Sequence, residues 1–179
     1  MAANMEAPKR GLQYEGEAGE IRDDAFHGTT FSNALNILKT GFIPHLGIAG
    51  VGSYFDLASD ASAIEFALIR SGGDREQAVI IRAELHLGNV LDISFERNSE
   101  VKRQFQQFQS NLKRHLGESY QLTFNEAKER FLQELYPNIN SVLYFNARTS
   151  IEYAAIRDPK RIRILSATTL TGRDLLCIP

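Results

Sequence analysis

The sequence predicts a single α+β domain in which the strands pair mainly antiparallel. A chain of 179 residues with 43% hydrophobic content has the size and the apolar material for one substantial core. Helical and strand-like segments are mixed in the first part of the chain, and from Ser141 onward strands dominate. Such an order favours an α+β fold over a doubly wound parallel sheet.

The elements follow from hydrophobic periodicity and from the positions of glycine, proline and capping residues. Residues 79–87 alternate apolar and polar side chains, as a strand with one buried face does. Thr123 and Glu126 have the spacing of a capping box, which predicts the start of a helix. The first predicted elements are a strand over 25–30, a helix from Phe31 to Gly41 with Ser32 as N-cap, a glycine-rich loop over 41–52, a strand over 53–55 and a helix from Ser59 to Gly72. The strand over 79–87 and two helices between 98 and 138 follow, and the first of these helices has an apolar stripe over Val101, Phe105, Phe108, Leu112 and Leu116. The last predicted elements are strands over 142–145, 151–156 and 162–165.

Composition narrows the class of protein. The formal net charge of -2 gives no global reason for tight, nonspecific binding to nucleic acid or to an anionic membrane. Cys177 is the only cysteine, which excludes an intrachain disulfide and a cysteine-rich zinc site and fits a reducing compartment. The longest apolar runs fall far short of the roughly 20 residues that span a bilayer. We therefore expect a cytoplasmic protein, or one delivered into a target cell, that does not insert into a membrane.

The chain divides into two parts. Residues 1–24 mix charged residues with glycine and proline and lack the apolar core of a secretory signal, which predicts a flexible leader. Residues 25–179 form the domain, with a two-helix insertion at about 98–138. The histidines have no metal-ligand spacing with one another or with carboxylates, so we expect no metal site.

Three short segments place a polar residue on a strand, or at its end, beside glycine or other small residues. They are Phe26-His27-Gly28-Thr29, Gly50-Val51-Gly52-Ser53-Tyr54-Phe55 and Ser150-Ile151-Glu152-Tyr153. Taken alone, each has an ordinary structural explanation: His27 as a turn or core histidine, Tyr54 as a core residue and Glu152 as a carboxylate facing solvent. Their joint order and spacing, with matching helices and a strand between them, favour a functional interpretation.

With these segments the chain resembles the ADP-ribosyltransferase superfamily, in the poly(ADP-ribose) polymerase-like branch that carries a His-Tyr-Glu triad. The resemblance covers most of residues 25–98 and 141–166. It implies an ADP-ribosyltransferase-like fold of two packed, mainly antiparallel sheets flanked by helices. It also implies an enzyme that cleaves NAD⁺ between nicotinamide and ribose and transfers ADP-ribose to a macromolecular acceptor.

The resemblance also implies roles for individual residues. Glu152 would hydrogen-bond the 2′-hydroxyl of the nicotinamide ribose and stabilise the oxocarbenium-like transition state electrostatically. His27 would bond the adenosine ribose, and Tyr54 would stack on the cationic nicotinamide ring. The main chain of Gly28 would hold the carboxamide, together with the hydroxyl of Ser62. The expected catalytic residues are thus His27, Tyr54 and Glu152, and the expected NAD⁺-binding residues are His27, Gly28, Thr29, Tyr54, Ser62 and Phe66.

Two departures from the family pattern refine this expectation. Many members have a second aromatic residue three positions after the serine, but here that position is Glu65 and the aromatic is Phe66. Either Phe66 takes over or the nicotinamide is stacked on one side only. Two helices between 98 and 138 replace longer loops near the acceptor site of polymerase members, so we expect transfer of single ADP-ribose units.

The acceptor and the competing activities stay open at this point. The acceptor is a protein or a nucleic acid, and an antitoxin or regulatory partner would fit a toxin or effector. Water as acceptor would make the protein an NAD glycohydrolase. An RNA 2′-phosphotransferase also begins with His-Gly-Thr, but it needs a pair of arginines and a second histidine at set positions, and this chain has Tyr54 and Glu152 at the diagnostic places instead. A noncatalytic module that binds ADP-ribose or a partner would have no physical need for Glu152. Two basic groups are either solvated faces or a docking surface for an acidic acceptor: Arg97, Lys102, Arg103, Lys113 and Arg114, and Arg157, Lys160, Arg161 and Arg163.

Overall fold

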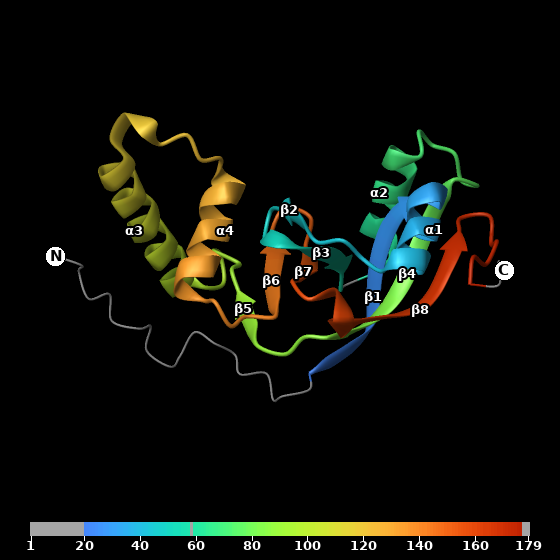
Figure 1. The fold of residues 1–179 in the computed structure, drawn as a ribbon. Helices are drawn as coiled ribbons and strands as arrows, with labels where there is room; N and C mark the ends of the chain where they lie inside the picture. Colours follow the sequence, from blue (N-terminus) through green and yellow to red (C-terminus); the bar gives the residue numbers. More distant parts are fainter. Residues whose placement is uncertain (1–19, 58, 177–179) are drawn as a thin grey trace.

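The computed structural model describes residues 20–57 and 59–176, and it combines helices with a mostly antiparallel sheet (Figure 1). The strands are β1 (Ile21–Thr30), β2 (His45–Gly47), β3 (Gly50–Asp56), β4 (Ala78–His86), β5 (Val90–Asp92), β6 (Ser141–Asn146), β7 (Ile151–Ile156) and β8 (Ile162–Thr169). The helices are α1 (Phe31–Thr40), α2 (Ala61–Arg70), α3 (Ser99–Leu116) and α4 (Phe124–Leu135), with short 3-10 turns at η1 (Gly117–Ser119) and η2 (Pro159–Arg161). The predicted α+β class is confirmed.

The strands join into one eight-stranded sheet, where two packed sheets were expected. Its order is β5-β6-β7-β3-β1-β4-β8, with β2 attached to β3. All of these pairs are antiparallel except β5 with β6, which is parallel. In Figure 1, β1, β4 and β8 lie together at one end of the molecule, and β5, β6 and β7 lie toward α3 and α4 at the other.

The sheet is nearly divided between β1 and β3. β1 pairs with β4 along its length, from Ile21 to Thr30. Its register with β3 consists of one pair among the described residues, Phe26 with Asp56. This place, where the two strands separate beyond Phe26, is called the β1–β3 junction below. The sheet is therefore continuous, but it consists of two groups of strands that are joined through this one registered pair.

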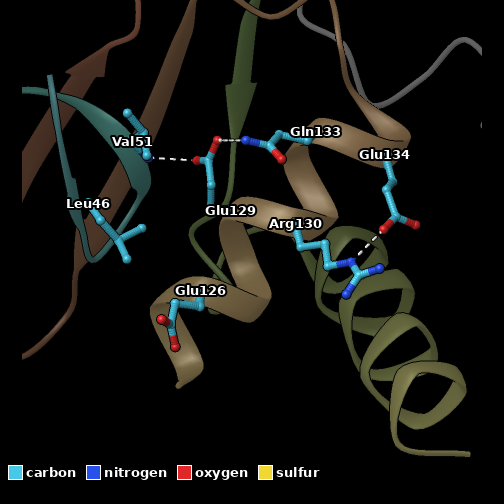
Figure 2. Close-up of a pocket in the computed structure, with 7 residues that line it drawn as sticks. All are labelled: Leu46, Val51, Glu126, Glu129, Arg130, Gln133 and Glu134. Atoms are coloured by element: carbon cyan, nitrogen blue, oxygen red, sulfur yellow. Dashed lines mark hydrogen bonds and ion pairs between the residues drawn. The ribbon is translucent and has the colours of Figure 1, made fainter. Parts of the chain in front are cut away.

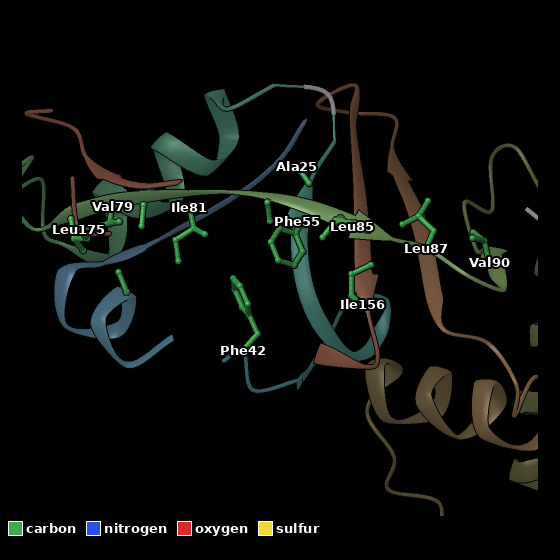
Figure 3. Close-up of a cluster of buried hydrophobic side chains, with 14 residues drawn as sticks. Ala25, Phe42, Phe55, Val79, Ile81, Leu85, Leu87, Val90, Ile156 and Leu175 are labelled. Atoms are coloured by element: carbon green, nitrogen blue, oxygen red, sulfur yellow. The ribbon is translucent and has the colours of Figure 1, made fainter. Parts of the chain in front are cut away.

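Two clusters of buried hydrophobic side chains fill the domain. The first packs α1 against the sheet and includes Phe42, Phe55 and Ile81 (Figure 3). The second packs α3 and α4 against β5, β6 and β7, and it includes Phe105 and Phe131. Burial of these large side chains stabilises the fold by roughly 1.5–3 kcal/mol for each one that leaves water completely.

Local sequence signals account for some helix boundaries, but the caps of α2 are Asp60 and Ser71 and not the expected Ser59 and Gly72. Thr123 and Glu126 form the predicted capping box at the start of α4. α1 ends at Gly41 as expected, but its N-cap is Thr30, whose hydroxyl accepts from the N–H of Asn33, and not Ser32. The apolar stripe of α3 is buried as predicted at Val101, Phe105, Phe108 and Leu112, and Leu116 packs at its edge.

Part of the expected leader belongs to the first strand, and the expected insertion contains two helices. Residues 21–24, assigned to the leader from sequence, belong to β1; residues 1–19 lie outside the described part of the chain. Residues 98–138 contain α3, η1 and α4, in agreement with the two predicted helices. Within the described residues, no helix combines the length and the apolar character needed to cross a membrane.

Candidate functional site

The three triad residues lie on three neighbouring strands around the β1–β3 junction. His27 is on β1, Tyr54 on β3 and Glu152 on β7, and these strands are adjacent in the sheet order. Paired strands are about 4.8 Å apart, so β1 and β7 are roughly 10 Å apart where Phe26 pairs with Asp56 and Asp56 with Tyr153. Segments that are distant in sequence therefore meet within one small region of the sheet.

His27 bridges the junction with its side chain. Its Nδ1 lies 2.8 Å from the main-chain oxygen of Tyr54. A carbonyl oxygen can only accept, so Nδ1 carries a proton and Nε2 of the neutral ring is left as an acceptor. The ring packs edge-on against Phe42, with centroids 5.2 Å apart, and against Phe55 at 5.7 Å. Burial lowers the pKa of His27 below 6.5, although the bond to Tyr54 opposes this shift, so the ring is neutral near pH 7.

Gly28 has main-chain groups that face the open side of the junction. The N–H of Phe31 donates to the carbonyl of Gln77, on the β4 side, at 2.8 Å. Successive residues of a strand direct their main-chain groups to alternate sides, so those of Gly28 point away from β4 and toward β3. Past Phe26, β1 has no registered partner on that side within the described residues. An N–H and a C=O that point to one side are what a carboxamide requires.

The absence of a side chain at Gly28 also allows α2 to approach β1. A Cβ atom at this position would lie 1.8 Å from the main-chain oxygen of Ala63. The glycine is therefore required by packing as well as by the proposed contact with substrate. Ala63 and Ala67 are the buried residues of α2, which explains the small side chains seen in the sequence there.

The side chains of the triad occupy two faces of the sheet. Phe55 and Ala154 belong to the first buried cluster, and His27 packs against Phe55, so His27 and the alternating position Glu152 share this face. We call it the α1 face. Tyr54 lies on the opposite face, together with Asp56, to which Ser62 of α2 donates a hydrogen bond. We call this second face the α2 face; the junction lies between the two.

Tyr54 closes the hairpin formed by β2 and β3. Its hydroxyl donates to the carbonyl of Gly50 at 2.5 Å and accepts from the N–H of Ala49 at 2.9 Å. The ring lies so close to Gly47 that a Cβ there would be 2.6 Å from it. Burial raises the pKa of Tyr54 to about 12, so the hydroxyl stays protonated. The structure thus brings the main chain of Tyr54 to His27, but places its ring under the hairpin.

Glu152 is paired with an arginine that the sequence did not single out as a site residue. Its Oε1 accepts from Nη1 of Arg97 at 3.2 Å. The Arg97 guanidinium lies 3.5 Å from the ring centroid of Phe145, the residue opposite Glu152 on β6. About a third of the Glu152 side chain is exposed, so a ligand can reach it. Arg97 had appeared only as one member of a basic group, because its partner lies 55 positions later in the chain.

The remaining expected NAD⁺-binding residues differ in their placement. Ser62 lies beside the junction because its hydroxyl bonds to Asp56, the β3 partner of Phe26, and its oxygen can still accept from a ligand. Thr29 is 2% exposed within the β1–β4 ladder. Phe66 is 52% exposed on α2, and its ring lies against the guanidinium of Arg70. The structure gives Phe66 no contact that would identify it as the second stacking aromatic.

A pocket of about 300 Å³ lies between α4 and the β2–β3 hairpin, and none of its lining residues belongs to the triad (Figure 2). Its wall includes Glu129, which accepts from the N–H of Val51 at 2.6 Å and from both Arg157 nitrogens, at 2.6 and 2.9 Å. Burial opposes ionisation of Glu129, but these hydrogen bonds hold its pKa below the usual value. The other charged lining residues are Glu126, Glu134 and Arg130, and Arg130 pairs with Glu134, so the wall has a net negative charge. Such an acidic wall would repel a diphosphate, so we do not assign this pocket to NAD⁺.

The two basic groups are partly used within the fold. Arg157 pairs with Glu129, Arg163 lies 3.6 Å from Glu84, and Arg103 pairs with Glu100. The remaining exposed cations of α3 are Lys102, Lys113 and Arg114. No three His, Cys, Asp or Glu side chains within the described residues are grouped as a metal ion would require.

A scan against models of known protein families and a search of curated protein sequences each found no match.

Proposed function

We propose that this protein is an NAD-dependent mono-ADP-ribosyltransferase, which cleaves the nicotinamide–ribose bond and transfers ADP-ribose to a protein or a nucleic acid. One observation carries the proposal: residues of all three motifs surround the β1–β3 junction, where the pairing of the sheet is interrupted. NAD⁺ is thus a substrate in this reaction and not a resident cofactor. The resemblance in sequence and the arrangement around the junction support the same function.

The nicotinamide would bind on the α2 face. The main chain of Gly28 offers a donor and an acceptor on the open edge of β1, and the Ser62 oxygen offers a second acceptor. Together these groups match the N–H₂ and C=O of a carboxamide. Tyr54 is on this face, but its ring lies against Gly47. Stacking on nicotinamide therefore requires a shift of the β2–β3 hairpin.

The ribose groups would bind on the α1 face. Nε2 of His27 is an acceptor that can bond a ribose hydroxyl, because Nδ1 is already held by the carbonyl of Tyr54. Glu152, on the same face, supplies a negative charge where positive charge develops on the ribose. The C1′–N bond breaks, and its electron pair leaves with neutral nicotinamide. The acceptor nucleophile then forms a bond to C1′ and loses a proton.

The test is release of nicotinamide and labelling of macromolecules by purified protein with NAD⁺ labelled in the adenine. We expect wild type to release nicotinamide and Glu152→Gln to be slower by about 100-fold or more, because the charge acts mainly in the transition state. Glu134→Gln, which removes an exposed carboxylate on α4, is the matched control and should retain full activity. NAD⁺ bound by wild type without nicotinamide release would contradict the proposal. Label found only as free ADP-ribose would assign the protein as an NAD glycohydrolase.

A further inference from the structure

Arg97 is fixed beside Glu152 by contacts on two sides of its guanidinium. One side of the group is the ring of Phe145, 3.5 Å from the guanidinium carbon. At its edge, Nη1 donates to Oε1 of Glu152 at 3.2 Å. Phe145 and Glu152 face each other across β6 and β7, so both contacts come from one cross-strand pair. Within the described part of the chain, Oε2 of Glu152 accepts no hydrogen bond.

The loop that carries Arg97 is itself bonded to the sheet. Ser94 is buried, and its hydroxyl accepts from the N–H of Phe145 at 2.8 Å. The carbonyl of Ser94 accepts from the N–H groups of Arg97 and Asn98, at 2.8 and 2.7 Å. Asn98 in turn caps α3 and donates to the carbonyl of Asp92. The arginine is therefore held by a turn that is anchored on the strand next to Glu152.

We propose that Arg97 is a positioning residue for Glu152. By binding Oε1 it orients the carboxylate so that Oε2 is the oxygen presented to the substrate, where the proposed reaction needs an acceptor for the ribose 2′-hydroxyl. The inference rests on the proposed function, and it adds a residue that the His-Tyr-Glu motif does not contain. Arg97 would act by holding the Glu152 carboxylate in a fixed orientation, since small displacements of catalytic groups reduce reaction rates strongly.

The ion pair between Arg103 and Glu100 on α3 is a surface pair away from the triad, and it can be compared with the pair between Arg97 and Glu152. Arg103 lies on the surface of α3 and pairs with Glu100 one turn earlier. Among the described residues, Arg103 contacts neither the sheet nor the triad, and its guanidinium lies over no aromatic ring. Exposed pairs of this kind stabilise proteins little. Arg103→Met is therefore the matched control for substitution of Arg97.

The experiment compares steady-state nicotinamide release by wild type, Arg97→Met, Arg97→Lys and the control, and it adds Arg97→Ala and Glu152→Gln for a rescue assay with guanidinium ion. Methionine keeps an apolar stem over Phe145 but removes the charge and the donors. We expect kcat of Arg97→Met to fall by at least about 10-fold, with KM for NAD⁺ changed by less than about 2-fold. Lysine keeps a charge without the planar fork, so it should retain an intermediate kcat. Added guanidinium ion should partly restore Arg97→Ala, whereas it should leave Glu152→Gln unchanged.

The outcomes separate the two proposals. An active wild type whose Arg97→Met variant keeps its kcat overturns the positioning role and leaves the proposed function intact. A rise in KM with kcat unchanged overturns it as well, because Arg97 would then bind substrate and not orient Glu152. A wild type that binds NAD⁺ without releasing nicotinamide overturns both proposals. Melting temperatures of all variants show whether a loss of rate reflects unfolding.

Discussion

Lys128 illustrates how much a single buried charge depends on its surroundings. It is 4% exposed on α4, and its Nζ donates to the carbonyl of Ile48 at 2.6 Å. The ammonium lies 4.5 Å from the ring centroid of Phe124 and 5.5 Å from that of Tyr144. Aromatic faces and one carbonyl replace only part of the lost hydration, so burial lowers the pKa of Lys128 to about 8.

This pKa predicts that stability rises with pH above about 8. The pKa of Lys128 is lower in the folded protein than the ordinary 10.5, so between these values the unfolded chain binds more protons. The free energy of unfolding should increase by about 1–3 kcal/mol from pH 8 toward pH 10. Urea unfolding across this range measures it. The rise should disappear in Lys128→Met and persist in the surface variant Lys102→Met; a flat profile in wild type would contradict the buried cation.

Gly28 permits a prediction about packing alone. Gly28→Ala would place a Cβ 1.8 Å from the Ala63 oxygen, so α2 must move away from β1. We expect a loss of about 2–3 kcal/mol in the free energy of unfolding. Gly172→Ala, at φ +92 with open space around it, should cost only the backbone strain of about 1–2 kcal/mol. Chemical denaturation of both variants tests the comparison, and an equal loss would show that α2 does not pack as described.

At the scale of elements, the β2–β3 hairpin is what the sequence failed to predict. Residues 41–52 are rich in glycine and predicted a loop, but His45–Gly47 forms a strand. The hairpin is stabilised by Tyr54 from within and by Lys128 and Glu129 from α4. The two partners on α4 lie 78–80 positions away in sequence. Local patterns do not contain such contacts.

Where an element depends on local chemistry, the sequence predicted it well. The alternation over 79–87 is confirmed, since Val79, Ile81, Ala83, Leu85 and Leu87 are all buried. The capping box of α4 is confirmed for the same reason, because both of its hydrogen bonds lie within four residues. β5 was missed: it has three residues, too few for a periodic signal, and its partner β6 lies after the two inserted helices.

The tie between α4 and the hairpin can be tested at Glu129. Glu129→Gln removes the charge that faces Arg157, whose side chain is only 20% exposed, so a partly buried cation loses its counterion. We expect a loss of about 2–4 kcal/mol in stability and faster hydrogen exchange at the N–H of Val51, which now bonds to the carboxylate. Glu134→Gln, an exposed neighbour on the same helix, should leave both quantities unchanged. Unaltered exchange at Val51 would show that the hairpin does not depend on α4.

At the scale of the whole molecule, the sequence predicted the class of fold but not the continuity of its sheet. Whether two groups of strands form one sheet or two depends here on a single registered pair, Phe26 with Asp56. The hydrophobic periodicity of the sequence cannot predict such a pair. The candidate site is similar in this respect: the motifs predicted His27 and Glu152, but they contained nothing about Arg97 or about the face on which the Tyr54 ring lies.

The burial of His27 predicts that the stability of the fold decreases in acid. Burial lowers the pKa of His27 below 6.5, so the neutral ring is the form that the folded protein favours. As pH falls below 6.5 the unfolded state takes up the proton first, and the free energy of unfolding should decrease. His27→Asn keeps a side-chain donor near the Nδ1 position and cannot titrate, so its stability should vary less between pH 7 and pH 5. Identical pH profiles for the two proteins would contradict the burial of a neutral His27 ring.

The path of the backbone holds together the two groups of strands that meet at the β1–β3 junction. β1, β4 and β8 lie on one side of it and β3, β5, β6 and β7 on the other, yet along the sequence the chain passes repeatedly between these sides. Each passage is a covalent connection between the strands on the two sides of the β1–β3 junction. A single proteolytic nick in one connecting loop would therefore leave the two parts covalently joined through the other connections. The sparse pairing of the two groups of strands and their covalent connection are thus separate properties, the first set by missing backbone hydrogen bonds and the second by chain connectivity.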